Sequence, residues 1–157
     1  MIRLAMGISR LTILVSCLST LAGAACAGEI HKAVKAKYIP RIEQLLDEGG
    51  ATLANSRAEG GSTPLHWAAG AGKVNTMEVL ISLGADVDAL SDSDATPLHQ
   101  AVLQHHPEAV KLLIRSNADL NSQNKSGYTP LDYATANGWA DLAELLQTAG
   151  AVPGKSL

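Results

Sequence analysis

Apolar residues recur along this chain at two spacings, a short one within segments and a long one between them. The short spacing is three or four positions, which places the residues on one face of an α-helix. The long spacing is 33 residues and separates three copies of a phrase that begins Thr-Pro-Leu, at Thr63, Thr96 and Thr129. A repeat of this length predicts a stack of small units, because no single unit can bury its apolar face alone.

Each copy of the phrase is expected to begin a helix. The threonine hydroxyl can cap free backbone amides, and proline is harmless at the first helical position, where its missing amide would have no partner. A leucine and, three positions later, an alanine then point to the same inward side of the helix. These pairs are Leu65 and Ala68, Leu98 and Ala101, and Leu131 and Ala134.

A second helix is expected in each unit, with an apolar face that forms the seam to the neighbouring unit. Pro107 fits the first turn of one such helix, and Gly84 or Asn117 supplies the left-handed residue that ends it. The polar segments that follow, 86–95 and 119–128, are expected to form turns or hairpin-like fingers. The seam residues are Ile42, Leu45 and Leu46, then Met77, Leu80 and Ile81, then Val110, Leu113 and Ile114.

The amino-acid composition indicates the fold class. A chain of 157 residues, of which 46% are hydrophobic and 17% charged, has room for one domain with a continuous core. Phe is absent, and the small and unbranched residues that dominate suit closely packed helices better than a sheet filled by aromatic side chains. The sequence therefore predicts an all-α solenoid, whose extended surface is suited to recognition.

The repeated phrase, the Gly-Ala-Asp at 84–86 that ends a unit, and the 33-residue period together resemble the ankyrin repeat, from Glu29 to Ala151. The resemblance implies about four stacked helix-turn-helix units with hairpin-like fingers. It also implies protein–protein interaction through the concave face, without catalysis. We expect an ankyrin-repeat domain over 28–152 and a short flexible tail over 153–157; the units span about 28–60, 61–93, 94–126 and 127–152.

The two end units are expected to be caps. In the first, Lys32, Lys35 and Lys37 occupy helix faces that would otherwise meet a preceding repeat, and in the last, Gln147 stands where the inner units have isoleucine. Polar ends keep further copies from stacking, so we expect a monomer.

Residues 1–27 form a different kind of segment. Two arginines precede an apolar run over 11–21 and a string of small residues over 22–27, a pattern typical of a secretory signal peptide. Cleavage is expected before Gly28, with a cut after Ala24 as the second choice, and an uncleaved anchor helix is disfavoured because the apolar run is short. The leader predicts an exported protein, periplasmic or, as the alternative, secreted.

Both cysteines, Cys17 and Cys26, lie in this leader, so the cleaved protein would contain no disulfide. Either could instead be the acylated cysteine of a lipoprotein, which would add a lipid anchor. Two of the 12 basic residues also lie in the leader, so 10 would remain against 15 acidic residues, a net charge of about −5. No nucleic acid is expected to bind such a chain, since phosphate contacts need clustered Lys and Arg.

The resemblance also places the surface that varies between partners. Tyr128 would project from a finger as an exposed aromatic anchor, and the acidic concave face around it favours a partner with basic or amphipathic patches. The alternative is that these residues are only the solvated side of the solenoid. The candidate partner-binding residues are Leu90, Asp92, Ser93, Ala95, Leu103, Gln104, Gln123, Lys125, Ser126, Tyr128 and Asn137.

Other residues that invite a functional interpretation are assigned to structure. His66 and His99 belong to the repeated phrase, where the imidazole can bond the preceding threonine or a neighbouring loop amide. Asp132 replaces them in the last unit, which puts that loop hydrogen bond in doubt. The residues expected in the core or covering its end are Trp67, Gln100, Tyr133 and Trp139.

No cofactor is expected, and catalysis is the disfavoured alternative. His105 and His106 are adjacent on a turn, which is a poor chelate, although with His99 they could in principle support metal-assisted hydrolysis. Four aspartates over 86–94 lack the glycine and closing glutamate of a calcium loop. The sequence therefore favours an exported protein-binding module; the alternative is a secreted effector or inhibitor that binds a foreign protein.

Overall fold

The computed structural model of the protein describes residues 52–154. Within this range the regular structure is helical and contains no strand, which confirms the predicted all-α fold of stacked helix pairs. A short 3-10 turn, Glu59–Gly61, precedes the first pair. The three pairs are α4 (Pro64–Gly70) with α5 (Val74–Ser82), α6 (Pro97–Leu103) with α7 (Pro107–Arg115), and α8 (Pro130–Ala136) with α9 (Ala140–Thr148).

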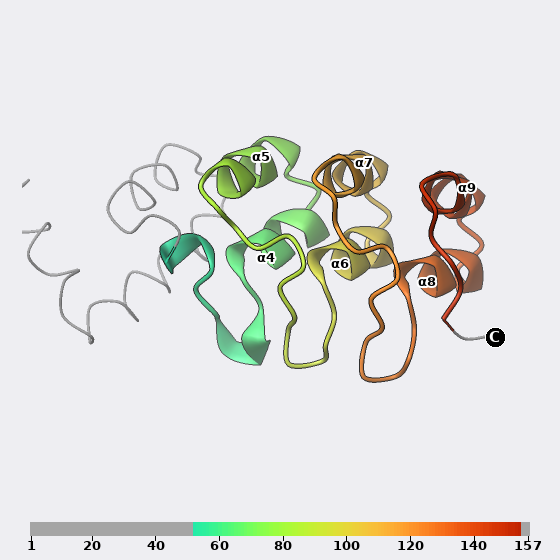
Figure 1. Ribbon diagram of the computed structural model, residues 1–157, viewed down its shortest axis with the longest axis horizontal. Helices are drawn as coiled ribbons and strands as arrows, with labels where there is room; N and C mark the ends of the chain where they lie inside the picture. The colour runs from blue at the N-terminus through green and yellow to red at the C-terminus, as the bar shows by residue number, and fades with distance from the viewer. Residues whose placement is uncertain (1–51, 155–157) are drawn as a thin grey trace, which may run out of the picture.

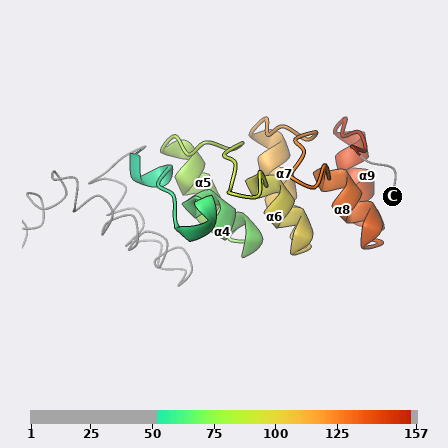
Figure 2. The ribbon, with the colours of Figure 1, turned by 90° about the horizontal axis from the view of Figure 1, so that it is seen from below.

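The pairs stand side by side in two rows (Figure 1). The row α4, α6, α8 lies next to the row α5, α7, α9, and the polar loops extend from the first row away from the second, as Figures 1 and 2 show together. Each helix contacts its pair partner and its counterpart in the next unit. We call the first row the inner helices and the second row the outer helices; the inner face is formed by the inner helices together with the polar loops.

The inner helices begin as the phrase predicts. Each threonine is the N-cap and each proline lies in the first turn. The side chain three positions after the threonine bonds back to the threonine amide, at 3.1 Å for His66 and His99 and 2.8 Å for Asp132. This reciprocal capping fixes the start of every inner helix.

The predicted ends of the outer helices are also present. Gly84 and Asn117 follow α5 and α7 with φ of 85° and 59°, in the left-handed region. Gly150 follows α9 with φ of 100°. A left-handed residue at this position lets the chain turn back toward the next finger.

The core lies between the two rows and continues from unit to unit. The inner-helix leucines and alanines of the phrase are buried, and so are most of the seam residues. Ile81 and Ile114 are half-buried at the rim, and Gln147 is exposed at their equivalent position in α9. The fully buried seam residues are Met77, Leu80, Val110 and Leu113.

The polar loops are hydrogen-bonded hairpins, which we call fingers 1, 2 and 3: 58–62, 91–95 and 124–128. In each, the first amide donates to the last carbonyl, at 2.9, 3.0 and 3.1 Å. The amide of Asp92 donates to Gly60 and that of Lys125 to Ser93, both at 3.0 Å, so neighbouring fingers are joined in the same register. Finger position is thereby set by the backbone, which leaves the side chains at the tips free to vary.

A second series of hydrogen bonds between units, which we call the Asn and Asp ladder, uses side chains and not only the backbone. Asn55 and Asp88 occupy equivalent positions, and their side-chain oxygens accept from the backbone amides of Asp86 at 2.7 Å and Asp119 at 2.8 Å. Asn121 continues the series by accepting from Val152 at 2.8 Å. Each unit is therefore held to the next by an Asn or Asp side chain at a fixed step of 33 residues.

Several sequence predictions fall outside residues 52–154. They concern the signal peptide over 1–27 with Cys17 and Cys26, the cap lysines Lys32, Lys35 and Lys37, the seam residues Ile42, Leu45 and Leu46, and the last residues of the tail, 155–157. Within the described part of the chain, no helix combines the length and apolar character needed to cross a bilayer.

Candidate functional site

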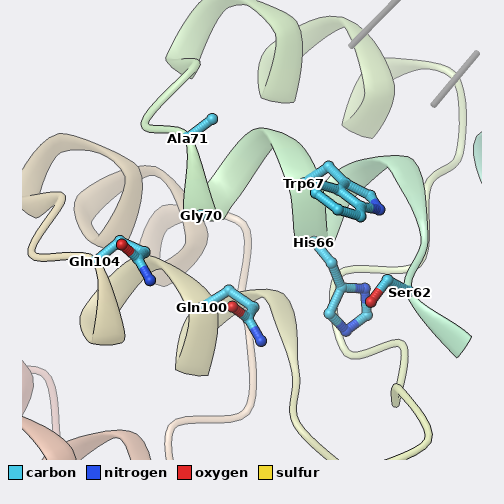
Figure 3. Close-up of a pocket in the computed structure, with 7 residues that line it drawn as sticks. All are labelled: Ser62, His66, Trp67, Gly70, Ala71, Gln100 and Gln104. Atoms are coloured by element: carbon cyan, nitrogen blue, oxygen red, sulfur yellow. The ribbon is translucent and has the colours of Figure 1, made fainter. Parts of the chain in front are cut away.

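The inner face contains a hollow of about 320 Å³ between α4 and α6. Figure 3 shows its lining: the indole of Trp67 and the small residues Gly70 and Ala71 come from α4 and its end, and two carboxamides come from α6 and its end. His66 and Ser62 complete it beside finger 1. The lining residues are Ser62, His66, Trp67, Gly70, Ala71, Gln100 and Gln104.

Trp67 corrects a sequence prediction. It was expected in the core, but its side chain is 40% exposed, whereas its equivalents Gln100 and Tyr133 are half-buried. One turn further along α4, Gly70 stands at the position that Leu103 holds in α6. Gly70 contributes no side chain to the hollow that the indole of Trp67 lines.

The glycine at position 70 is not required by the backbone. It is helical, and a Cβ added there would meet Cβ of Gln100 at 3.6 Å and Cγ of Gln104 at 4.0 Å, which are ordinary contact distances. Gly70 lines the hollow, and the methyl group of an alanine would fit there without forcing the helices apart. Glycine at this copy of the repeat, where the other two copies have Leu103 and Ala136, is the signal by which the sequence could have revealed the hollow.

A second hollow of about 210 Å³ lies one unit further along the inner face. It is bounded by α6, fingers 2 and 3, and the ring of Tyr133, and it shares Gln100 with the first hollow. Leu103 narrows it at the position where the first hollow has Gly70. Its lining residues are Ser93, Ala95, His99, Gln100, Leu103, Asn124, Lys125, Ser126 and Tyr133.

The structure brings together about half of the predicted partner-binding residues. Ser93, Leu103, Lys125 and Ser126 line the second hollow, and Gln104 lines the first. The remaining exposed candidates line neither hollow; they are Leu90, Asp92, Gln123 and Asn137.

Two of the candidates are less accessible than expected. Ala95 is buried at 7% exposure, and its carbonyl accepts a hydrogen bond from His66. Tyr128 is half-buried and its ring contacts that of Tyr133, with centroids 5.8 Å apart. The expected exposure of Tyr128 is therefore wrong, since part of its ring packs within its own unit, and its role in partner binding stays a prediction.

His66 and His99 hold the fingers in place. Nδ1 of His66 accepts from the amide of Thr63, so its Nε2 hydrogen donates to the carbonyl of Ala95 at 2.9 Å; His99 does the same for Tyr128 at 3.1 Å. The loop contact is to a carbonyl and not to the amide that the sequence suggested. Burial lowers the pKa of both imidazoles below the ordinary value, although the carbonyl hydrogen bond acts in the opposite direction.

Asp132 also forms the loop hydrogen bond that was in doubt, but its side chain accepts from the loop, whereas His66 and His99 donate to it. Its Oδ2 accepts from the amide of Gly154 at 3.1 Å as well as from the amide and hydroxyl of Thr129. An acceptor fits here because the loop presents an amide and not a carbonyl. The last unit is therefore closed by residues 152–154 instead of by a further finger.

His105 and His106 join neighbouring units. His106 Nε2 bonds the carbonyl of Gly70 at 3.2 Å, and His105 Nε2 lies 3.1 Å from Oδ1 of Asp141 and stacks on Trp139 at 4.9 Å. The hydrogen bond from His105 lowers the pKa of Asp141. Among residues 52–154, no group of three or more His, Cys, Asp or Glu is placed to hold a metal ion.

The carboxylates of the segment 86–94 lie outside the two hollows. The carboxylate of Asp86 accepts from the amide of Asp88 within the turn, and the carboxylate of Asp88 accepts from the amide of Asp119 in the next unit. Burial, together with the neighbouring Asp119 and Asp86 charges, raises the pKa of Asp88. Within residues 52–154, Lys125 is the one formally charged side chain that lines either hollow, since buried His66 and His99 are neutral near pH 7. The acidic character expected for the concave face is therefore absent from its hollows.

A third hollow, of about 340 Å³, lies on the outer helices between α7 and α9. It is lined partly by Lys111 and Glu108, which form an ion pair at 2.7 Å. It joins two units, whereas the two inner hollows share a wall and together reach from α4 to α8. The inner face therefore offers the longer continuous surface for a ligand.

Comparison with known families gives one match. The family model described as ankyrin repeats (3 copies) matches residues 30–124 and again residues 92–155. A search of curated proteins found no match to the chain.

Proposed function

The chain belongs to the ankyrin-repeat family, and we propose that its inner face is a surface that binds another protein. Ankyrin repeats generally form protein–protein interaction modules and are typically non-catalytic. The observation that supports the proposal for this chain is the open hollow at Trp67, where a large aromatic side chain of a fully capped helix is 40% exposed. Exposed aromatic residues beside a groove are the usual anchors of protein interfaces.

The inner face has the properties that such a surface needs. Capped helices and hydrogen-bonded fingers hold its side chains on a rigid frame, so little conformational entropy is lost on binding. The exposed apolar groups Trp67 and Leu103 lie in or beside the hollows, and the amides of Gln100 and Gln104 can bond a partner's backbone. An interface of standard size, about 800 Å² per partner, is within reach of such a stack.

Site-specific photo-crosslinking in living cells tests the proposal. A photoreactive amino acid placed at Leu103 or Gln104, both exposed on the inner face, is expected to give discrete adducts with a protein. The matched control is Glu78, which is exposed on outer helix α5. Adducts from Glu78 but not from the inner positions would show that binding, if any, uses another face.

The second part of the proposal is export, and it is supported by the residue pattern of 1–27. We expect the leader to be removed before Gly28, the protein to reside in the periplasm, and the binding partner to be a protein of that compartment. Cell fractionation with intact-mass measurement of the purified protein tests this. A mass that includes residues 1–27 would contradict cleavage, a lipid adduct at Cys17 or Cys26 would indicate anchoring, and recovery from the medium would favour a secreted binder of a foreign protein.

A further inference from the structure

Within residues 52–154, the exposed surface of the inner helices carries no formal charge. Of the side chains in α4, α6 and α8, that of Asp132 alone is formally charged, and it is 1% exposed. Every other Lys, Arg, Asp or Glu between residues 52 and 154 lies in a connecting segment or an outer helix. The exposed and half-buried residues of the inner helices and their C-caps are Trp67, Gly70, Ala71, Gln100, Leu103, Gln104, Tyr133, Thr135, Ala136 and Asn137.

The first hollow, between α4 and α6, combines an apolar wall with neutral polar groups. The indole of Trp67, which is 40% exposed, and the small residues Gly70 and Ala71 come from α4 and its end. The carboxamides of Gln100 and Gln104 come from α6 and its end (Figure 3), and neither has a hydrogen-bond partner among residues 52–154. The hollow can therefore take up an apolar group, and it offers uncharged donors and acceptors beside that group.

These properties restrict what can bind at the first hollow. A charged group of a partner would lose its hydration there without gaining an opposite charge, which is unfavourable. A carboxamide has a donor and an acceptor, as a peptide group has, so it can bond a partner's backbone. The peptide groups of a helix bond one another, whereas a loop or an extended segment presents some of them outward. The complementary surface is therefore uncharged, non-helical and partly apolar.

We propose that the first hollow binds an uncharged loop or extended segment of a partner protein, with one apolar side chain against Trp67 and backbone groups bonded by Gln100 and Gln104. The inference rests on the proposed function of the inner face and adds the chemistry of the bound segment. It differs from the basic or amphipathic partner that the net charge favours, because none of the described residues lining this hollow is acidic. Lys125 lines the second hollow and not the first.

Photo-crosslinking from position 103 in living cells tests the proposal. Leu103 is exposed beside Gln104 and does not line the first hollow, so a photoreactive residue there leaves the hollow intact. Mass spectrometry of the adduct identifies the partner residue that is joined. We expect this residue and its neighbours in the partner's sequence to be uncharged and outside any helix. A joined residue that lies in a charged or helical segment would overturn the inference.

Substitutions of opposite charge test whether the bound segment is neutral. Gln104→Lys and Gln104→Glu each place a charge on the exposed side of the hollow, and both are expected to lower the adduct yield about tenfold. The controls make the same changes of net charge on the outer helices, Glu78→Gln for the first and Arg115→Gln for the second, and should leave the yield unchanged. A higher yield with either sign would show that the partner carries the opposite charge and would refute the inference.

Gly70→Ala and Gly70→Leu test the apolar part. The alanine methyl group fits at ordinary contact distances, so that variant is expected to fold and to lower the adduct yield moderately. Leucine, which α6 has at the equivalent position, should lower the yield further, and urea denaturation checks that each variant is folded. An undiminished yield from the folded variants would overturn the inference and leave the proposed function standing. Absence of adducts from every inner position of the native protein would refute both.

Discussion

Nε2 of His66 lies 2.9 Å from the carbonyl oxygen of Ala95, so the first helix of one unit holds the finger of the next. His99 repeats the contact with Tyr128, and in the last unit Asp132 reverses its polarity toward Gly154. These bonds fix the fingers relative to the inner helices and so determine the shape of both hollows. They also make the stability of the solenoid depend on pH.

Acidification is expected to destabilise the protein from about pH 6.5 downward. The pKa of His66 and His99 is lowered in the folded state from an ordinary value of 6.5, mainly by burial, so the unfolded chain binds protons that the folded chain does not. Stability from these groups is complete above pH 6.5 and is lost as the pH falls through that value toward the lowered folded pKa. Urea denaturation at pH 7.5 and pH 5.5 should show a lower midpoint at pH 5.5, and an unchanged midpoint would contradict it.

His66→Asp is expected to destabilise the fold by about 1 to 3 kcal/mol, even though aspartate serves well at position 132. A carboxylate at position 66 would face the carbonyl of Ala95, an acceptor, whereas Asp132 faces the amide of Gly154. His66→Asn is the matched control, because its amide can still donate to the carbonyl. Denaturation curves that coincide for the two variants would show that partner polarity does not govern this position.

Leu113→Ala should cost about 2 to 5 kcal/mol of unfolding free energy. Leu113 is fully buried in α7, in the seam between the second and third described units, so its truncation leaves a cavity. Arg115→Ala, exposed two positions later on the same helix, is the control and should change stability little. Urea denaturation compares the two; similar midpoints for both variants would contradict the register of α7.

Asp88→Asn is expected to stabilise the protein at neutral pH by about 0.5 kcal/mol. Asparagine stands at the equivalent positions 55 and 121, and its oxygen can still accept from the amide of Asp119. The substitution removes a carboxylate whose pKa is raised by burial and by neighbouring Asp charges. Thermal denaturation measures the gain, which should shrink at acid pH as the native Asp88 becomes protonated.

Asp92→Asn is the control for this substitution. It removes the same charge from an exposed residue whose side chain takes no part in the Asn and Asp ladder, and it leaves the backbone bond from Asp92 to Gly60 in place. If it stabilises the protein as much as Asp88→Asn does, the gain comes from net charge and not from the environment of Asp88.

The errors in the sequence-based predictions have a common physical origin. The period, the capped helix starts and the buried leucines follow from local rules that act within one unit, and all were predicted correctly for the described residues. Trp67 and Tyr128 were assigned the wrong exposure because exposure depends on residues outside the repeated phrase. Trp67 lines an open hollow together with Gly70 and residues of the next unit, and the ring of Tyr128 packs on that of Tyr133.

The sequence by itself determined the solenoid, since a 33-residue repeat of helix signals and apolar faces can bury its surface only by stacking. Only the tertiary structure decided where the inner face is open and what charge it presents. Those properties arise between units, where Gly70 meets α6 and Lys125 reaches the hollow beside Tyr133, because the space and the charge at a unit boundary depend on side chains from both units.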